Sequence, residues 1–174
     1  MKKVVVFVIT LLLLLSLLTG CESERKNETK YIKARDRAIE YVEKNHDWDL
    51  SPTFKYETED NGVGVTYNVL GKKDSFGITG PFPIVAGVKQ KYFWFYWGED
   101  QIKDQPVEIM AYKKGSNELI KLFSGEFYEG AQISENEVNM PSNLKFPSAG
   151  VWNVLIYIND QLSGNIVVKV VPKG

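Results

Sequence analysis

The chain has 174 residues, and its 21 basic and 22 acidic residues give a formal net charge of −1 at pH 7. This balance provides no basic field for a phosphate backbone, so nucleic acid is not expected as a partner. A single cysteine excludes a disulfide-stabilised fold, a Cys-based zinc site and a CxxC redox pair. A single histidine removes most multi-histidine metal sites. The length is sufficient for one ordinary domain with a hydrophobic core.

The first 20 residues are predicted to be a signal peptide, which is set aside before the fold is considered. Lys2 and Lys3 form a short positive segment of the kind that stays in the cytoplasm. Residues 4–18 form an apolar run of 15 residues, interrupted only by one Thr and one Ser. A helix of that length is roughly 22 Å long, shorter than the ~30 Å hydrocarbon core of a bilayer. The run therefore favours a signal peptide over a membrane span.

The end of this segment, Leu18-Thr19-Gly20-Cys21, resembles the lipobox of bacterial lipoproteins. The resemblance implies that Cys21 forms a thioether with diacylglycerol and that the chain is cut just before it. Because two acyl chains anchor a protein stably, we expect the mature chain on the extracytoplasmic face of the cell membrane, with membrane lipid as its partner through Cys21. Removing residues 1–20 takes away two lysines and leaves 19 basic and 22 acidic residues, a net charge near −3. The alternative is a chance cysteine behind an ordinary signal peptide or membrane helix.

Two short segments precede the main domain. Residues 21–30 are predicted to be a polar tether, because Glu22 to Lys30 include no apolar side chain; a frayed first helical turn would also fit. Residues 31–50 are assigned to the N-terminal helix segment. The helical pattern itself is expected to begin slightly earlier, at Thr29, and to end at Asn45. Apolar side chains recur there at the three- and four-residue spacing of a helix, at Ile32, Ala38, Ile39 and Val42. This narrow stripe predicts that the helix docks on a sheet, with Trp48 as its anchor.

Residues 51–174 are predicted to form a β-sandwich, because short runs of Val, Ile, Tyr, Phe and Trp alternate with turn-forming residues. The expected strands are Phe54–Thr58, Val63–Leu70, Phe76–Ile78, Gln90–Trp97, Val107–Lys113, Glu118–Phe123, Asn143–Phe146, Gly150–Ile158 and Ser163–Val171. The last two form the clearest hairpin, with Asn159-Asp160 as its turn. One face of its first strand carries Trp152, Val154, Ile156 and Ile158. Gly164 in its second strand indicates a bulge or a close approach of another group.

Two stretches of the second half resemble known proteins. Residues 144–152, running into Tyr157 to Leu162, resemble the closing strands of immunoglobulin-like domains in bacterial surface proteins. Residues 89–98, preceded by Phe76 to Ile78, are similar to an uncharacterised lipoprotein family of Bacillus-type bacteria. The resemblance spans roughly residues 76–171 and implies a Gram-positive cell envelope but no activity. The expected fold is mainly β, an immunoglobulin-like antiparallel β-sandwich with one N-terminal α-helix, preceded by a lipoprotein signal peptide.

Six consecutive aromatic residues, Tyr92 to Trp97, are the most unusual feature of the predicted domain. Because side chains alternate along a strand, Tyr92, Trp94 and Tyr96 share one face and Phe93, Phe95 and Trp97 the other. One trio is expected to line the core. For the second trio there are two alternatives. It is covered, by the N-terminal helix with Trp48 or by a crossing loop, or it forms an exposed platform that binds sugar rings or a partner protein. The candidate binding surface is Tyr92, Trp94 and Tyr96, with Glu99 and Asp100 of the following loop.

Other polar clusters give weaker signals, and no metal or cofactor is predicted. His46 among Asp47 and Asp49 is better explained as a loop at the negative end of a helix than as a metal site. Two acidic stretches lack the spacing of a known calcium loop; they contain Glu57, Glu59 and Asp60, and Glu99, Asp100 and Asp104. If a ligand groove exists, the loop Gly98–Asp104 is expected to form its rim.

The sequence offers no catalytic constellation. It has no GxSxG nucleophile motif and no glycine-rich phosphate loop, whereas a carboxylate pair for glycoside hydrolysis remains open because its separation is spatial. We therefore predict a non-enzymatic binding or interaction module of the cell envelope, whose partner is another envelope protein or a wall polymer. The alternatives are an envelope hydrolase or enzyme inhibitor with a site built from acidic loops, and a structural accessory subunit of a membrane complex.

Overall fold

The computed structural model of the protein describes residues 28–29, 32–33, 36–37, 40–41, 44, 48–60, 62–116, 118–130, 133 and 137–174. The predicted signal peptide, the lipobox with Cys21, and His46 lie outside these residues. Contacts between residues divide the chain into two units, Met1–Tyr41 and Val42–Gly174. The described residues from 28 to 44 have helical backbone, while the full predicted helix and its docking stay predictions. Within the described part of the chain, no helix is long and apolar enough to cross a membrane.

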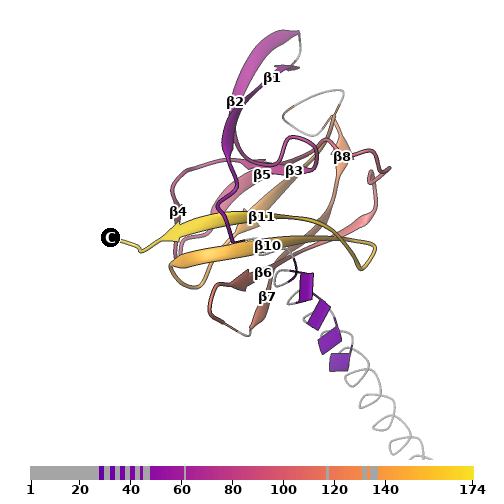
Figure 1. Cartoon of the computed structure of the whole chain (residues 1–174). Helices are drawn as coiled ribbons and strands as arrows, with labels where there is room; N and C mark the ends of the chain where they lie inside the picture. The colour runs from indigo at the N-terminus through magenta and orange to yellow at the C-terminus, as the bar shows by residue number, and fades with distance from the viewer. Residues whose placement is uncertain are drawn as a thin grey trace, which may run out of the picture. The chain divides into compact units, whose positions relative to one another are not determined.

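The second unit is mainly β, which confirms the predicted class (Figure 1). Its described strands are β1 Thr53–Asp60, β2 Val63–Gly71, β3 Phe76–Thr79, β4 Ile84–Val85, β5 Gln90–Tyr96, β6 Pro106–Lys113, β7 Leu119–Glu126, β8 Tyr128–Glu129, β9 Val138–Leu144, β10 Gly150–Ile158 and β11 Gln161–Val171. They form a six-stranded sheet in the order β1-β2-β3-β5-β9-β8 and a five-stranded sheet in the order β4-β11-β10-β6-β7. Paired strands are antiparallel except for β4 and β11, which are parallel.

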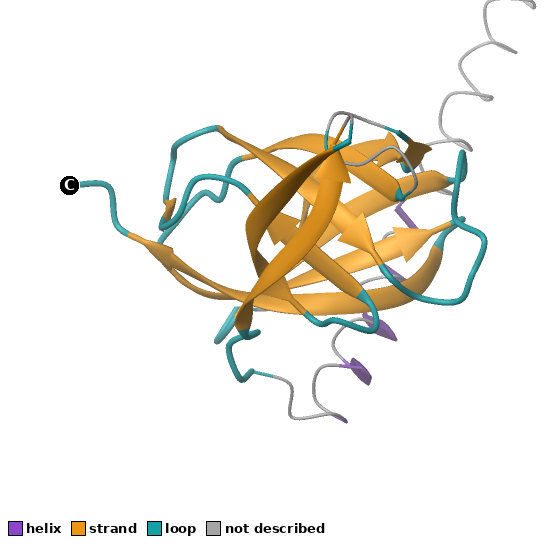
Figure 2. Cartoon of the chain, turned by 90° about the horizontal axis from the view of Figure 1, so that it is seen from above, coloured by secondary structure: helices purple, strands orange, loops and turns teal. Residues whose placement is uncertain are grey.

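Figure 2 shows the strands of the two sheets from above. One apolar core joins the inner faces of these sheets. The six-stranded sheet contributes large side chains that include Phe76, Ile78, Tyr92, Trp94, Met140 and Leu144. From β10, the predicted inner set of Trp152, Val154, Ile156 and Ile158 enters this core, which confirms the alternation read from the sequence. Burial of each large apolar side chain contributes about 1.5–3 kcal/mol, so the core is the main source of stability.

The C-terminal hairpin has the predicted turn. Asn159 and Asp160 have positive φ values of 48° and 64°, as a two-residue type I′ turn requires. The pairing of β10 with β11 shifts register between Ile156 and Tyr157, next to Gly164. A Cβ on Gly164 would lie 2.7 Å from the Cδ2 atom of Phe76. This glycine therefore allows the close approach that the sequence indicated.

The N-terminal hairpin, β1–β2, is joined to the rest of the fold mainly at its base. β1 and β2 pair with each other over eight residue pairs, from Thr53 opposite Leu70 to Asp60 opposite Val63. In contrast, β2 pairs with β3 only at two residue pairs, through Leu70 and Gly71. The hairpin therefore extends beyond the two layers, as the purple strands of Figure 1 show.

The chain just before β1 is attached to the five-stranded sheet through the backbone of β11. The backbone N–H of Ser51 donates to the carbonyl oxygen of Val167 at 3.0 Å, and the N–H of Val167 donates to the Ser51 hydroxyl at 2.9 Å. The ring of Trp48 lies 5.8 Å from that of Tyr112. Trp48 therefore does contact a sheet, as predicted of this side chain.

Candidate functional site

Two residues of the predicted binding surface lie in the core, which corrects that part of the prediction. Tyr92 and Trp94 are both 0% exposed. The Trp94 Nε1–H donates to the Ser142 hydroxyl at 3.0 Å, and the Tyr92 hydroxyl donates to the Pro81 carbonyl at 3.1 Å. Burial raises the pKa of Tyr92 to about 12. Their polar tips are thus bonded inside the fold, as buried Tyr and Trp require, and neither ring is available to a ligand.

Tyr96 lies at the edge of the core and is half-buried beside the acidic loop. Its ring centroid is 4.7 Å from that of Phe76, and its hydroxyl accepts a hydrogen bond from the backbone N–H of Asp100 at 3.1 Å. Burial raises the pKa of Tyr96, the bond from Asp100 opposes this rise, and the charges of Asp100 and Glu99 add to it. The structure therefore brings Tyr96, Glu99 and Asp100 together and separates them from the other two predicted residues.

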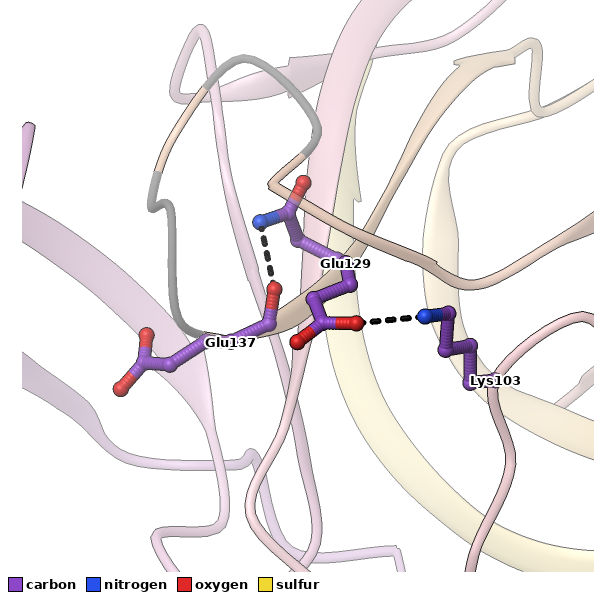
Figure 3. A network of polar contacts seen from close by, with 4 residues as sticks. Lys103, Glu129 and Glu137 are labelled. Carbon is purple, nitrogen blue, oxygen red and sulfur yellow. Dashed lines mark hydrogen bonds and ion pairs between the residues drawn. The ribbon is translucent and has the colours of Figure 1, made fainter.

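The acidic loop is tied to a neighbouring strand. Lys103 forms an ion pair with Glu129 of β8 (Figure 3). The hydrogen bond in this pair raises the pKa of Lys103 and lowers that of Glu129. Both side chains are exposed, so the pair is worth little to stability. Among the residues that the structure describes, no group of three acidic, His or Cys side chains could hold a metal ion.

A second aromatic group lies on the outer face of the six-stranded sheet. This outer aromatic cluster consists of Phe54 and Tyr56 from β1, Tyr67 from β2, Phe93 and Phe95 from β5, and Trp97 just after it. Tyr56 is 5.0 Å from Phe95 and 5.1 Å from Trp97 between ring centroids, and Phe95 stacks on Trp97 at 5.4 Å. The described cover over the second trio is therefore the β1–β2 hairpin together with Ile133 of the loop between β8 and β9, and a cover by the helix stays a prediction.

A glycine makes room for this cluster. Gly77 on β3 lies under Trp97, and a Cβ at that position would be 3.0 Å from the indole ring and 2.5 Å from a methyl group of Val69. Phe95 is 1% exposed, while Phe93 and Trp97 are only half-buried. The cluster thus has a buried centre and a partly exposed rim, which Lys91 borders with its ammonium 4.8 Å from the Phe93 ring.

Polar groups complete the rim. The Tyr56 hydroxyl donates to one carboxylate oxygen of Glu137, and the other oxygen is buried without a hydrogen-bond partner among the described residues. The side-chain amide of Asn139 donates to the backbone oxygen of Glu137 at 3.2 Å (Figure 3). Burial raises the pKa of Tyr56, and its bond to Glu137 raises it further. Flat rings with polar tips suit contact with a partner molecule.

Sequence reasoning missed a concave site, the lysine pocket, with a volume of about 750 Å³. The pocket lies between the β6–β7 turn and the β9–β10 loop, and its cationic lining consists of Lys113, Lys114, Lys121 and Lys145. The doublet Lys113-Lys114 before Gly115 was the available sequence signal. It could not reveal the pocket alone, because Lys145 is distant in the sequence and is brought there by the fold.

The chain resembles one protein family and several solved structures. Residues 40–168 match a family described as a domain of unknown function, DUF4871. The crystal structure of a candidate lipoprotein from Bacillus anthracis is similar, with a TM-score of 0.52 and 21% identity, over 72% of this chain and 87% of that chain. At this identity the likeness shows the fold alone. No curated protein matches the chain.

Weaker likenesses involve superoxide reductases. A neelaredoxin from Ignicoccus hospitalis gives a TM-score of 0.37 at 18% identity, over 56% of this chain and 80% of that one. A candidate superoxide reductase from Thermotoga maritima gives 0.40 at 14% identity, over 59% and 89%. At TM-scores below 0.5 these likenesses carry no argument about fold or activity.

Proposed function

The chain belongs to the DUF4871 family, and we propose that it is a lipid-anchored extracytoplasmic protein that acts as a non-enzymatic binding module of the cell envelope. The lipobox-like Leu18-Thr19-Gly20-Cys21 supports the anchor, and so does the structural likeness to a candidate lipoprotein. Two acyl chains on Cys21 would hold the domain at the outer face of the membrane.

The anchor is tested by expressing the full chain and a Cys21→Ala variant in a Gram-positive host. We expect the mature chain to begin at a diacylglyceryl cysteine and to stay in the membrane fraction, and the variant to lack the lipid. Mass spectrometry of the amino-terminal peptide checks this. Mature protein that retains residues 1–20, or carries an unmodified Cys21, would contradict the proposed anchor.

We also infer that the two-layered core is immunoglobulin-like. In the immunoglobulin fold, one sheet has its strands in the order A-B-E-D and faces a second sheet in the order G-F-C. In the variable type of the fold, strand C′ is added to the second sheet next to strand C. The strands β3-β5-β9-β8 follow the first order, and β11-β10-β6-β7 follow the second. On this interpretation the β1–β2 hairpin is an addition to the edge of the first sheet, and the outer aromatic cluster is built where that addition folds over it.

The observation that carries the binding function is this outer aromatic cluster. It lies outside the main core, its rings include half-buried Trp97 and Phe93, and its bordering tyrosine hydroxyl and lysine ammonium supply polar contacts. Aromatic residues with polar tips are enriched where proteins bind partners. The partner class remains another envelope protein or a wall polymer.

The contact surface is tested by co-sedimentation of the full chain, in a neutral detergent, with purified cell walls and with envelope membranes. Phe93→Ala and Trp97→Ala should each weaken retention at least about tenfold, as loss of a central aromatic contact does. Tyr128→Ala is the matched control, because Tyr128 is 44% exposed and lies outside the cluster. Equal retention of all variants with unchanged thermal stability would contradict this surface.

The hydrolase alternative has less support in the described residues. Its site requires two carboxyl groups about 5–10 Å apart in a concave cleft. The lysine pocket is lined by one carboxylate, Glu118, among four lysines. Glu99 and Asp100 are exposed on their loop. A non-enzymatic role is therefore the one we propose.

A further inference from the structure

We propose that the lysine pocket is a second binding site, separate from the outer aromatic cluster, and that it binds an organic phosphate: a phosphate ester that carries a neutral sugar or polyol. The pocket belongs to the edge of the core next to β7, whereas the outer aromatic cluster lies on the outer face of the six-stranded sheet. This inference does not depend on the proposed anchor or on the proposed contact surface.

Charge separation is the first argument. The whole chain has a net charge of −1, yet four lysines and one glutamate line this pocket, a local excess of two positive charges once Glu108 beside Lys121 is counted. Lys121 is paired with Glu108 at 2.7 Å. Among the described residues, Lys114 and Lys145 have no carboxylate partner, and the Lys114 ammonium lies 5.8 Å from the ring centroid of Trp48. A concave site with one sign of charge concentrates ligands of the opposite sign.

The pocket is also held in shape before any ligand arrives. The Lys113 ammonium donates to the Ser148 hydroxyl at 3.0 Å, and the Trp152 indole N–H donates to the Ser148 carbonyl at 3.0 Å. The backbone N–H of Lys114 donates to the Val151 carbonyl at 2.9 Å. These bonds link the β6–β7 turn to the β9–β10 loop. Because the elements that carry the lysines are fixed to each other, binding orders lysine side chains but does not have to order the backbone.

Size and lining select the ligand class. A volume of about 750 Å³ lies within the ~300–1,000 Å³ typical of small-molecule sites and far exceeds the needs of a bare anion. The lining also includes the apolar side chains of Ile120, Leu122 and Pro147, which suit a neutral moiety. Ammonium groups bind phosphate as point charges, and the cationic lining of the pocket consists of lysines. An esterified phosphate fits all three features.

The test is calorimetric titration of the full chain in discs of neutral phosphatidylcholine with glycerol 3-phosphate, inorganic phosphate and citrate. We expect glycerol 3-phosphate to bind most tightly, and Lys114→Ala combined with Lys145→Ala to weaken it at least about tenfold. Lys89→Ala is the control, because this exposed lysine lies outside the pocket. The affinity should also fall with added salt, and less steeply in the double variant.

Several results would overturn the proposal. They are absence of binding, equal affinity for citrate or inorganic phosphate, and an equal loss in the Lys89→Ala control. Adding phosphatidylglycerol to the discs identifies the source of the ester. If phosphatidylglycerol in the discs weakens the binding of soluble glycerol 3-phosphate, the site is assigned to lipid headgroups. If the affinity for glycerol 3-phosphate is unchanged, the site is assigned to soluble or polymeric esters. Because the wall co-sedimentation test uses Phe93 and Trp97 variants, failure of that test leaves this one intact.

Discussion

The two faces of β5 both carry aromatic residues, but these residues differ in how far they are buried. Tyr92 and Trp94 face inward, lie opposite a complete sheet and are 0% exposed. On the outward face, which the β1–β2 hairpin and Ile133 cover, Phe93 and Trp97 remain half-buried and only Phe95 between them is fully buried. Tyr96, on the inner face but at the end of the strand, is also half-buried. The exposure of an aromatic residue in this strand is therefore decided by what the topology places opposite each ring, and not by the residue type.

The largest expected effect concerns the inner face. Trp94→Ala should lower the free energy of unfolding by about 3–5 kcal/mol, because it opens a cavity in a closed core and removes the hydrogen bond to Ser142. The neighbouring Phe93→Ala should cost only about 1 kcal/mol, since part of the Phe93 side chain already contacts solvent. Urea denaturation of the two variants measures the difference. Similar losses would mean that the two faces are equally closed.

A smaller, local effect is expected at the centre of the outer aromatic cluster. Phe95→Ala should lower the free energy of unfolding by about 3 kcal/mol, the low end for a buried Phe→Ala change, and release the β1–β2 hairpin, which pairs with β3 at only two residue pairs. Hydrogen exchange should accelerate at β1 and β2 amides while β10 and β11 remain protected. Uniform acceleration over both sheets would show that the hairpin and the core unfold as one.

The rim contributes less. Tyr56→Phe removes the hydroxyl that bonds Glu137, and the loss of one hydrogen bond at a partly buried site should cost about 1 kcal/mol. Thermal denaturation at neutral pH measures the change. As a matched control, Tyr128→Phe removes an exposed hydroxyl on β8 and should leave stability unchanged. If the Tyr56→Phe variant is as stable as the control, the bond between Tyr56 and Glu137 does not stabilise the hairpin.

The ionisation of Tyr92 has no effect on stability at neutral pH and lowers stability only at alkaline pH. Burial raises the pKa of Tyr92 from 10.0 to about 12, so between these values the unfolded chain loses a proton that the folded chain keeps. Stability from this group is complete below pH 10 and is lost as the pH rises toward about 12. Tyr92→Phe should therefore show a shallower alkaline decline in the free energy of unfolding. Parallel declines would contradict this burial effect.

Much of the β architecture could be predicted because it depends on local pattern. Alternation identified the inner face of β10, and Asn159-Asp160 identified the hairpin turn, because both signals lie within a few residues. The strands β4 and β8 were missed because two-residue strands are too short to show a period. The β9 strand also starts earlier than predicted, at Val138.

The sites could not be predicted in the same way, because they depend on contacts between distant residues. Both trios of β5 are aromatic, so the sequence pattern could not show which one the opposite sheet would cover. The outer cover comes from Tyr56 and Tyr67, far upstream in the chain. The lysine pocket likewise unites Lys113 with Ser148 across 35 residues of sequence.

The attachment of Ser51 to Val167 has a mechanical consequence. A chain pulled from its amino-terminal end transmits tension along its backbone, and within the continuously described part that begins at Trp48 the two bonds between Ser51 and β11 come before any strand. Strand β1 begins only after them, at Thr53. We therefore expect tension from the amino-terminal side to load the five-stranded sheet at Ser51 before it reaches the β1–β2 hairpin and its aromatic surface.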